Sequence, residues 1–352
     1  MSRNSKILEW LAAHNEASHK ELAGLIASAD DSTLDYAAGL AREITSVVYG
    51  RKVYLRGLVE ISNRCACGCY YCGLRAENSN VARYTLSEGE MLESCKEGYR
   101  LGLRSFVLQG GEVRDNAERV ADVVRKIKQT MPDVAVTLSL GEQSEEVYAL
   151  WREAGADRYL LRHETASREH YERLHPERQT YEGRMRCLGT LRSLGYQVGA
   201  GFMVGSPYQR EDELAREVEF LLELRPEMVG IGPFIPQSNT PFANMKRGSV
   251  EQTLLMLSLV RIALPKVLLP ATTALASSDE SGTVRGVLAG ANVVMPNITP
   301  PQYRPHYAIY DGKKSIGSES GEGLRLLQEE LNGVGYTAAM ERGDHSDFVK
   351  KD

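Results

Sequence analysis

The chain has 352 residues, of which 42% are hydrophobic and 25% are charged, and its formal net charge is −5. This composition is typical of a soluble globular protein with enough apolar material for a large core. The small negative net charge gives no indication of a basic surface that would bind nucleic acid or an anionic membrane. The N-terminus lacks the apolar core of a signal peptide, and the most apolar stretch, residues 254–265, is too short to span a bilayer and contains Arg261. These features indicate a cytoplasmic protein.

The first fifty residues predict helices only. Ser18 and Glu21 have the spacing of a capping box, and residues 30–50 carry apolar side chains at helical spacing up to Gly50. After residue 50 a short apolar or β-branched run alternates with an amphipathic helix, as at residues 87–102, 116–131 and 208–226. We expect strands at residues 53–62, 105–109, 134–140, 158–164, 197–204, 228–235, 267–273 and 292–297.

Eight predicted strands that alternate with helices indicate an α/β fold with a parallel sheet. Eight is the number that closes such a sheet into a (β/α)8 TIM-type barrel. A doubly wound open sheet is the alternative, but it favours a phosphate-binding loop after the first strand, where cysteines stand instead. No linker interrupts residues 50–300. We therefore expect an N-terminal helical segment (1–50) packed on a barrel (51–300), with a C-terminal extension (301–352) over or beside it.

Four of the six cysteines lie in the loop that follows the first predicted strand, at Cys65, Cys67, Cys69 and Cys72. Six cysteines are too few for a disulfide scaffold, so the cluster indicates a metal or redox site. Cys65, Cys69 and Cys72 give a C-x3-C-x2-C spacing, in which three thiolates would leave one iron of a cubane open for chemistry. A zinc site of four thiolates and a redox thiol cluster are the alternatives. The spacing favours an iron–sulfur site over these alternatives.

Polar residues also stand where other predicted strands end, which is the end of a barrel that carries chemistry. Glu112 follows two glycines and either receives an ammonium group or is a solvated turn residue. Thr137 and Ser139 share one face of their strand, at a spacing of two.

The fourth predicted strand carries an unusual set of charges. Arg158, Arg162 and Glu164 face the same side, where they either bind a ligand carboxylate or form a structural ion pair. His163 faces the other side, and we expect it to be a packed histidine.

The cysteine spacing, with Tyr71 directly before Cys72, resembles the signature of the radical S-adenosylmethionine (SAM) superfamily. The resemblance implies one [4Fe–4S] cluster on Cys65, Cys69 and Cys72, whose open iron binds the amino and carboxylate groups of SAM. This assignment leaves Cys67 without a ligand role, and we interpret it as a spectator. One electron then cleaves the cofactor to a 5′-deoxyadenosyl radical. Gly110, Gly111 and Glu112 would be the superfamily's GGE motif, which binds the cofactor's amino group.

Longer segments resemble the HydE-type maturases of FeFe-hydrogenase, from about residue 20 to 310. They are ISNRCACGCYYCGLR, VTLSLGE, ADRYLLRHETA, MVGIGPFIP, PATTA and ANVVMPNITPPQYR. The resemblance implies that the cofactor is bound by Tyr71, Gln109, Gly110, Gly111, Glu112, Thr137, Ser139, Glu164 and Arg184. It implies that the substrate cavity is lined by Arg158, Arg162, Thr272, Thr273 and Tyr303.

The resemblance further implies a radical enzyme that acts on a cysteine-bound iron carbonyl–cyanide precursor of the diiron site. Its partners would be this small organometallic or amino-acid-derived substrate, a reductant protein and other hydrogenase maturases, without nucleic acid or membrane. Some family members carry three further cysteines near the C-terminus, whereas residues 310–323 here contain serines and no cysteine. We therefore expect no second cluster.

Three other functions compete with this one. Sulfur insertion of the biotin-synthase kind needs a second cluster, and the remaining cysteines, Cys95 and Cys187, lie in helical patterns outside the barrel. A carbon-skeleton mutase like methylornithine synthase would use one cluster in the same barrel. A non-catalytic iron–sulfur carrier would need the cysteine loop but not the polar residues at the other strand ends.

Overall fold

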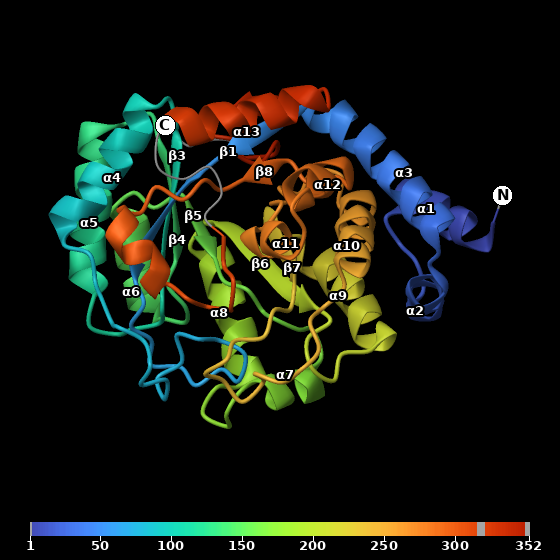
Figure 1. The fold of residues 1–352 in the computed structure, drawn as a ribbon, viewed down its shortest axis with the longest axis horizontal. Coiled ribbons are helices and arrows are strands. Elements are labelled where there is room, and N and C mark those ends of the chain that lie inside the picture. Colours follow the sequence, from blue (N-terminus) through green and yellow to red (C-terminus); the bar gives the residue numbers. More distant parts are fainter. Residues whose placement is uncertain (1, 315–320, 349–352) are drawn as a thin grey trace.

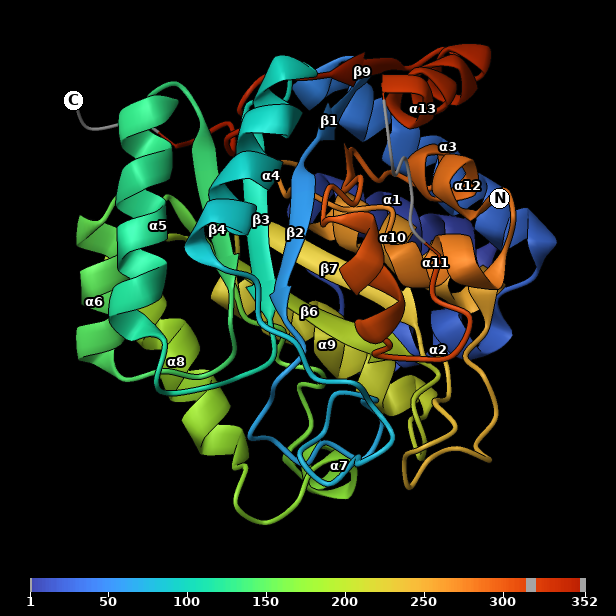
Figure 2. The same cartoon turned by 60° about the vertical axis from the view of Figure 1, so that its left-hand side comes forward.

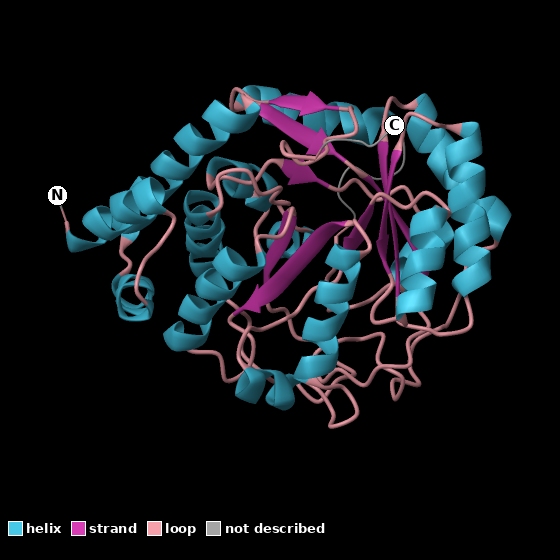
Figure 3. Ribbon diagram, turned by 180° about the vertical axis from the view of Figure 1, so that it is seen from behind, coloured by secondary structure: helices cyan, strands magenta, loops and turns pink. Residues whose placement is uncertain are grey.

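The computed structural model describes residues 2–314 and 321–348, and its centre is a ring of parallel strands surrounded by helices (Figures 1 and 3). Six strands pair in chain order: β2 (Gly57–Ser62), β3 (Ser105–Gly110), β4 (Ala135–Ser139), β5 (Arg158–Leu160), β6 (Gln197–Val204) and β7 (Met228–Pro233). A second sheet has the order β8-β1-β9, with β1 (Lys52–Leu55), β8 (Val293–Val294) and β9 (Thr337–Ala339).

Isolated parallel bridges close these strands into a barrel. Residues 228 and 231 of β7 pair with residues 268 and 271, residue 270 pairs with 293 of β8, and residue 297 returns to pair with residue 58 of β2. The predicted (β/α)8 class is therefore confirmed. The seventh predicted strand is reduced to bridges because Pro270 has no N–H and the Leu269 N–H donates to the Asn292 side chain.

Helices cover the outside of the barrel. Those before β7 are α1 (Arg3–His14), α2 (His19–Ser28), α3 (Asp31–Tyr49), α4 (Glu88–Arg100), α5 (Ala117–Thr130), α6 (Glu145–Glu153), α7 (Arg168–Leu174), α8 (Tyr181–Ser193) and α9 (Glu211–Leu224). Those after it are α10 (Val250–Ala263), α11 (Thr273–Ser278), α12 (Gly282–Leu288), the 3-10 helix η1 (Pro301–His306) and α13 (Gly321–Gly333). No helix in the described ranges is long and apolar enough to cross a membrane.

The N-terminal helices form as the sequence predicts. The Ser18–Glu21 capping box opens α2, and α3 ends at Gly50, whose φ of +64° suits a glycine. These helices pack on the outside of the barrel, with α2 against α9 and α3 against α10 (Figure 1).

Along β5 and the residues that follow it, successive side chains point alternately into the barrel and toward the outer helices. Tyr159 points outward and packs against Tyr148, Trp151 and Tyr196. His163 also points outward, where its Nε2 lies 2.7 Å from the Glu217 carboxylate, and both side chains are fully buried. The expectation of a packed histidine is met, and the charged residues on the other face of the segment point into the barrel.

The C-terminal extension covers both ends of the barrel. Residues 307–314, which we call the strap, lie at the carboxyl ends of the strands, near the cysteine loop and α11. Beyond α13, the chain returns through β9 to the amino ends, and Figure 2 shows the strands running from that end toward the loops around α7.

A charged cluster closes the amino end. Asp344 accepts hydrogen bonds from Arg158, from Arg342 Nε at 2.8 Å and from Gln197 Nε2 at 2.9 Å. Arg56, fully buried, donates to the Gly343 carbonyl at 3.1 Å. Burial opposes ionisation of Asp344, but Arg158 and Arg342 outweigh it and hold the pKa of this carboxyl below its ordinary value.

Replacing Asp344 with asparagine should therefore lower the free energy of unfolding by about 3 kcal/mol, because the buried guanidinium of Arg158 loses its partner. Asp347→Asn is the control, since its ion pair with Lys266 is exposed at both ends and contributes less than about 1 kcal/mol. Denaturant unfolding followed by circular dichroism measures both variants. The contribution of Asp344 to the free energy of unfolding is present above about pH 4, the ordinary pKa of an aspartate in the unfolded chain. It is lost as the pH falls through the lower pKa of Asp344 in the folded state. Equal losses in the two variants would contradict this assignment.

Candidate cluster and cofactor site

The cysteine loop is fixed to the carboxyl end of β3 by backbone contacts. Ala66 N donates to the Glu112 carbonyl at 2.8 Å, and Gly111 N donates to the Ser62 carbonyl at 3.1 Å. A Cβ atom at Gly111 would lie 2.2 Å from the Arg64 carbonyl oxygen and 2.7 Å from the Cβ of Cys65. Only glycine therefore permits this approach, which explains the second glycine of the GGE motif physically.

The four thiols of the loop interact with one another. Hydrogen bonds from the Cys67 thiol lower the pKa of Cys65 and Cys69 and raise the pKa of Cys67 itself. Burial raises the pKa of Cys72, whose sulfur accepts a hydrogen bond from Leu74 N at 3.4 Å. Within the described ranges, no three Cys, His, Asp or Glu side chains are grouped so that they could hold a metal ion. The choice between zinc and an iron–sulfur cluster therefore comes from the family comparison below.

Two residues that the sequence analysis missed support this loop from the segment after α7. Gln179 accepts from Gly68 N at 2.9 Å and donates to the Cys69 sulfur at 3.3 Å. His175 Nε2 lies 3.1 Å from the Tyr71 hydroxyl. Neither residue stands in a spacing pattern with the cysteines, since about 100 positions separate them from the loop.

The ends of β3 and β4 and helix α8 are connected by charged side chains. Glu112 accepts from Glu142 N at 2.7 Å, and burial raises the pKa of the Glu112 carboxyl. Arg184 reaches from α8 to Glu142 Oε1 at 2.6 Å and to the Arg162 carbonyl at 2.6 Å. Glu142 was not among the predicted residues, yet it links Glu112 to Arg184.

Polar atoms without hydrogen-bond partners lie along the inner wall. Within the described part of the chain they include Arg162 Nε near the carboxyl end, and Thr137 Oγ1 and Arg158 Nε, which lie in register with each other nearer the amino end. Arg162 Nη2 and Glu164 Oε2 lie 3.3 Å apart without an aligned hydrogen bond. Glu164 also has φ of +66°, which costs on the order of 1 kcal/mol or more for a residue other than glycine. Unpaired polar atoms and backbone strain at one place are typical of a ligand site.

Strand register brings further predicted residues together. Gln109 is paired in register with Ser139 on one side and with Glu60 on the other. Gln109 Nε2 also donates to the Tyr307 hydroxyl at 3.3 Å. Thr272 caps α11 through Leu275 N and donates to the Ile231 carbonyl at 3.1 Å, and Thr273 is the first residue of that helix. These side chains stand at the carboxyl ends of their strands.

Two predicted cavity residues lie elsewhere. Tyr303 is outside the barrel, since it stacks on Tyr84 and its hydroxyl donates to Glu90 Oε1 of α4 at 2.8 Å. The side chain of Tyr303 therefore does not meet the other predicted cavity residues in this structure, whereas Tyr307, which follows η1, is buried. Arg158 lies inside the barrel but at the amino end, where Asp344 and Ser105 Oγ already accept its hydrogen bonds.

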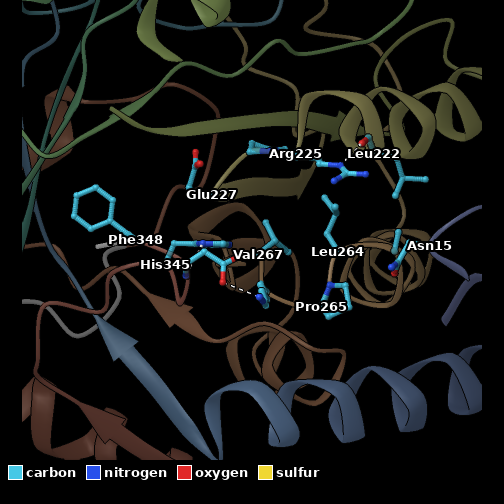
Figure 4. A pocket seen from close by; sticks show the side chains of 13 residues that line it. Asn15, Leu222, Arg225, Glu227, Leu264, Pro265, Val267, His345 and Phe348 are labelled. Carbon is cyan, nitrogen blue, oxygen red and sulfur yellow. Dashed lines mark hydrogen bonds and ion pairs between the residues drawn. The ribbon is translucent and has the colours of Figure 1, made fainter. Parts of the chain in front are cut away.

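A cavity of about 370 Å³ lies at the amino end of the barrel (Figure 4). Its lining includes Arg225 and Glu227 before β7, Pro265 before the seventh strand segment, and His345 and Phe348 of the C-terminal segment. It contains no cysteine, and barrel chemistry is carried by the opposite end. We therefore do not assign the reaction to this cavity.

The family model of the radical SAM superfamily matches residues 59–221. The [FeFe] hydrogenase maturase subunit HydE of Thermotoga maritima is 46% identical over 275 residues, which cover 78% of each chain. The 3-methylornithine synthase of Methanosarcina acetivorans is 26% identical over 93% of this chain and 91% of its own. A solved methylornithine synthase (PylB) superposes with a TM-score of 0.82 at 25% identity, covering 96% of this chain and 97% of that one.

The cysteine loop after β2, the matched family model and the identity of 46% to HydE together define a radical SAM enzyme. Within that superfamily, the chain belongs to the HydE family of FeFe-hydrogenase maturases. For this family a [4Fe–4S] cluster and SAM are the expected cofactors. The donor set fits them, because Cys65, Cys69 and Cys72 are free thiols on one loop, and buried Arg162 Nε and Glu164 Oε2 have no hydrogen-bond partner in the described part of the chain.

Serine variants of the four loop cysteines test which thiols hold iron. We expect Cys65→Ser, Cys69→Ser and Cys72→Ser each to lose the cluster, and Cys67→Ser to retain the iron content of the parent protein. Iron and sulfide analysis after anaerobic reconstitution, with the visible absorbance of the cluster, is the measurement. Loss of iron in Cys67→Ser alone would reverse the assignment of this residue.

Proposed function

We propose that this enzyme cleaves SAM reductively to a 5′-deoxyadenosyl radical and uses it on a cysteine-bound iron carbonyl–cyanide precursor of the FeFe-hydrogenase diiron site. The identity of 46% to a HydE maturase over 78% of the chain is the observation that carries the proposal. We assign the catalysis to residues 51–300, with residues 1–50 and 301–352 as additions to the barrel.

Cys65, Cys69 and Cys72 would hold the cluster, and a bound [4Fe–4S] cluster would supply the electron for SAM cleavage. Glu112 and its neighbours Gly110 and Gly111 would receive the amino group of SAM, since Gly111 lets the cysteine loop approach this strand end closely. The remaining cofactor contacts would come from Tyr71, Gln109, Thr137, Ser139, Glu164 and Arg184. Glu164 is supported by its unpaired carboxylate oxygen at the carboxyl end of the barrel. Thr137 has an unpaired hydroxyl but lies deeper in the barrel, in register with Arg158.

The substrate would lie deeper in the barrel. Arg162 offers unpaired guanidinium atoms to a carboxylate, and charge-assisted hydrogen bonds of this kind are strong. Thr272 and Thr273 would line the opposite side of the site. Tyr307 and Tyr310 of the strap bury their hydroxyls at this end, and we propose them in place of Tyr303. The wall of the barrel would keep water away from the radical.

We further propose a cytoplasmic location, because the free thiols of the loop require a reducing compartment. The partners would be a reductant protein and the other hydrogenase maturases.

A second candidate is a carbon-skeleton mutase that acts on an amino acid. It is favoured by the TM-score of 0.82 to methylornithine synthase and by a relative of that name that covers 93% of the chain. Formation of 3-methylornithine by the reconstituted protein would support this candidate over the first.

Two assays together test the main proposal. The reduced, reconstituted protein should release 5′-deoxyadenosine from SAM, and a variant without Cys65, Cys69 and Cys72 should release none. The gene should also restore active FeFe-hydrogenase in a host that lacks its own HydE. Absence of SAM cleavage would favour the iron–sulfur carrier, and SAM cleavage without hydrogenase maturation would favour a relative with another substrate.

We also propose a single cluster per chain. Residues 310–323 contain no cysteine, although residues 315–320 lie outside the described part of the chain. We expect about four irons per chain after reconstitution, because one cubane holds four. Iron analysis against amino-acid analysis measures this ratio, and a reproducible excess, such as about eight irons, would show a second site.

A further inference from the structure

The strap, residues 307–314, is bonded to three other parts of the barrel mouth. The Ile309 carbonyl accepts from Gly73 N at 2.9 Å, and Asp311 N donates to the Pro236 carbonyl at 3.2 Å. Lys314 N donates to Ser277 Oγ at 2.9 Å. The strap therefore connects the cysteine loop, the segment after β7 and helix α11.

One strap side chain passes into the barrel interior. Lys313 Nζ lies 2.6 Å from Glu60 Oε1, with side-chain exposures of 8% and 0%. The same ammonium lies 5.4 Å from the centre of the Tyr307 ring. Lys313 is thus placed between the strap tyrosine and a buried carboxylate of the barrel wall.

Glu60 is held from several sides by the barrel itself. Asn297 Nδ2 donates to its Oε2 at 3.1 Å, its own N–H donates to Thr299 Oγ1 at 2.8 Å, and Tyr84 OH donates to its carbonyl at 2.9 Å. The carboxylate is therefore the fixed partner of the pair. Lys313 is the partner that moves if the strap moves.

Stability alone does not account for this pair. Desolvation of two charges costs about as much as their attraction returns, so an apolar pair of similar volume is often neutral or more stable. A buried ion pair does hold the strap in one position relative to the barrel, because a displaced ammonium would leave the Glu60 carboxylate buried without its cation. The pair is therefore suited to holding the strap in one position.

We propose that Lys313 is a positioning residue, which closes the strap over the barrel mouth through Glu60 and thereby sets Tyr307 and Tyr310 against the reacting groups. Closure by this pair keeps water away from the radical once cofactor and substrate are inside. This consequence for turnover rests on the proposed function, whereas the closure itself does not.

Hydrogen exchange of the reconstituted full chain tests the closure without turnover. In Lys313→Met, the amides of Gly73, Asp311 and Lys314, which donate the hydrogen bonds between the strap and its surroundings, should exchange about tenfold faster or more, because the strap opens more often. Glu60→Gln should give the same change. Lys314→Met is the matched control, since this neighbouring lysine is exposed, and it should exchange like the parent. Unchanged exchange in Lys313→Met would overturn the proposal.

The yield of product per SAM cleaved tests the proposed effect of strap closure on turnover. Lys313→Met should keep its iron content and cleave SAM, but form several-fold less product per 5′-deoxyadenosine released. Lys313→Arg, which keeps the charge, should restore most of the yield, and Lys313→Met with Glu60→Gln should be no worse than either single change. An unchanged yield in Lys313→Met, or additive losses in the double variant, would overturn the positioning role. If the parent protein itself cleaves no SAM, the proposed function fails, and hydrogen exchange still decides whether Lys313 closes the strap.

Discussion

The approach of the cysteine loop to the end of β3 is the constraint on which the rest of this site depends. Gly111 has no room for a Cβ atom, and the backbone contacts on either side of it fix where the loop leaves the barrel. Once the loop is placed, Gln179 and His175 can reach it from the next layer of the fold. The polar residues of β3 and β4 then share one end of the barrel with the thiols, where SAM and a cluster would meet.

The charged side chains at the two ends of the barrel differ in how far they are paired within the protein. At the amino end, both terminal nitrogens of Arg158 donate hydrogen bonds, to Ser105 Oγ and to Asp344, and its Nε is left without a partner. At the carboxyl end, Arg162 and Glu164 lie close but leave hydrogen-bonding atoms of both side chains unused. The C-terminal chain makes this difference, because Asp344 pairs with the first arginine and not with the second.

Much of this arrangement could be predicted from the sequence, because it depends on local pattern. The strand and helix alternation, the cysteine spacing and the outward direction of His163 all follow from residues that are neighbours in the chain. Contacts between distant segments could not be predicted. The pairing of Arg158 with Asp344 spans 186 positions, and the choice between Tyr303 and Tyr307 depends on how a short proline-containing 3-10 helix is turned.

Gly73 joins two parts of the molecule that are otherwise far apart in the chain. It stands directly after Cys72, and the Ala308 carbonyl oxygen of the strap occupies the place where its Cβ atom would be. The loop that carries the thiols and the strap are therefore in direct backbone contact beside Cys72, both through this packing and through the hydrogen bond from Gly73 N to the Ile309 carbonyl. A strap that moves, as proposed above, would also move the backbone next to a proposed cluster ligand.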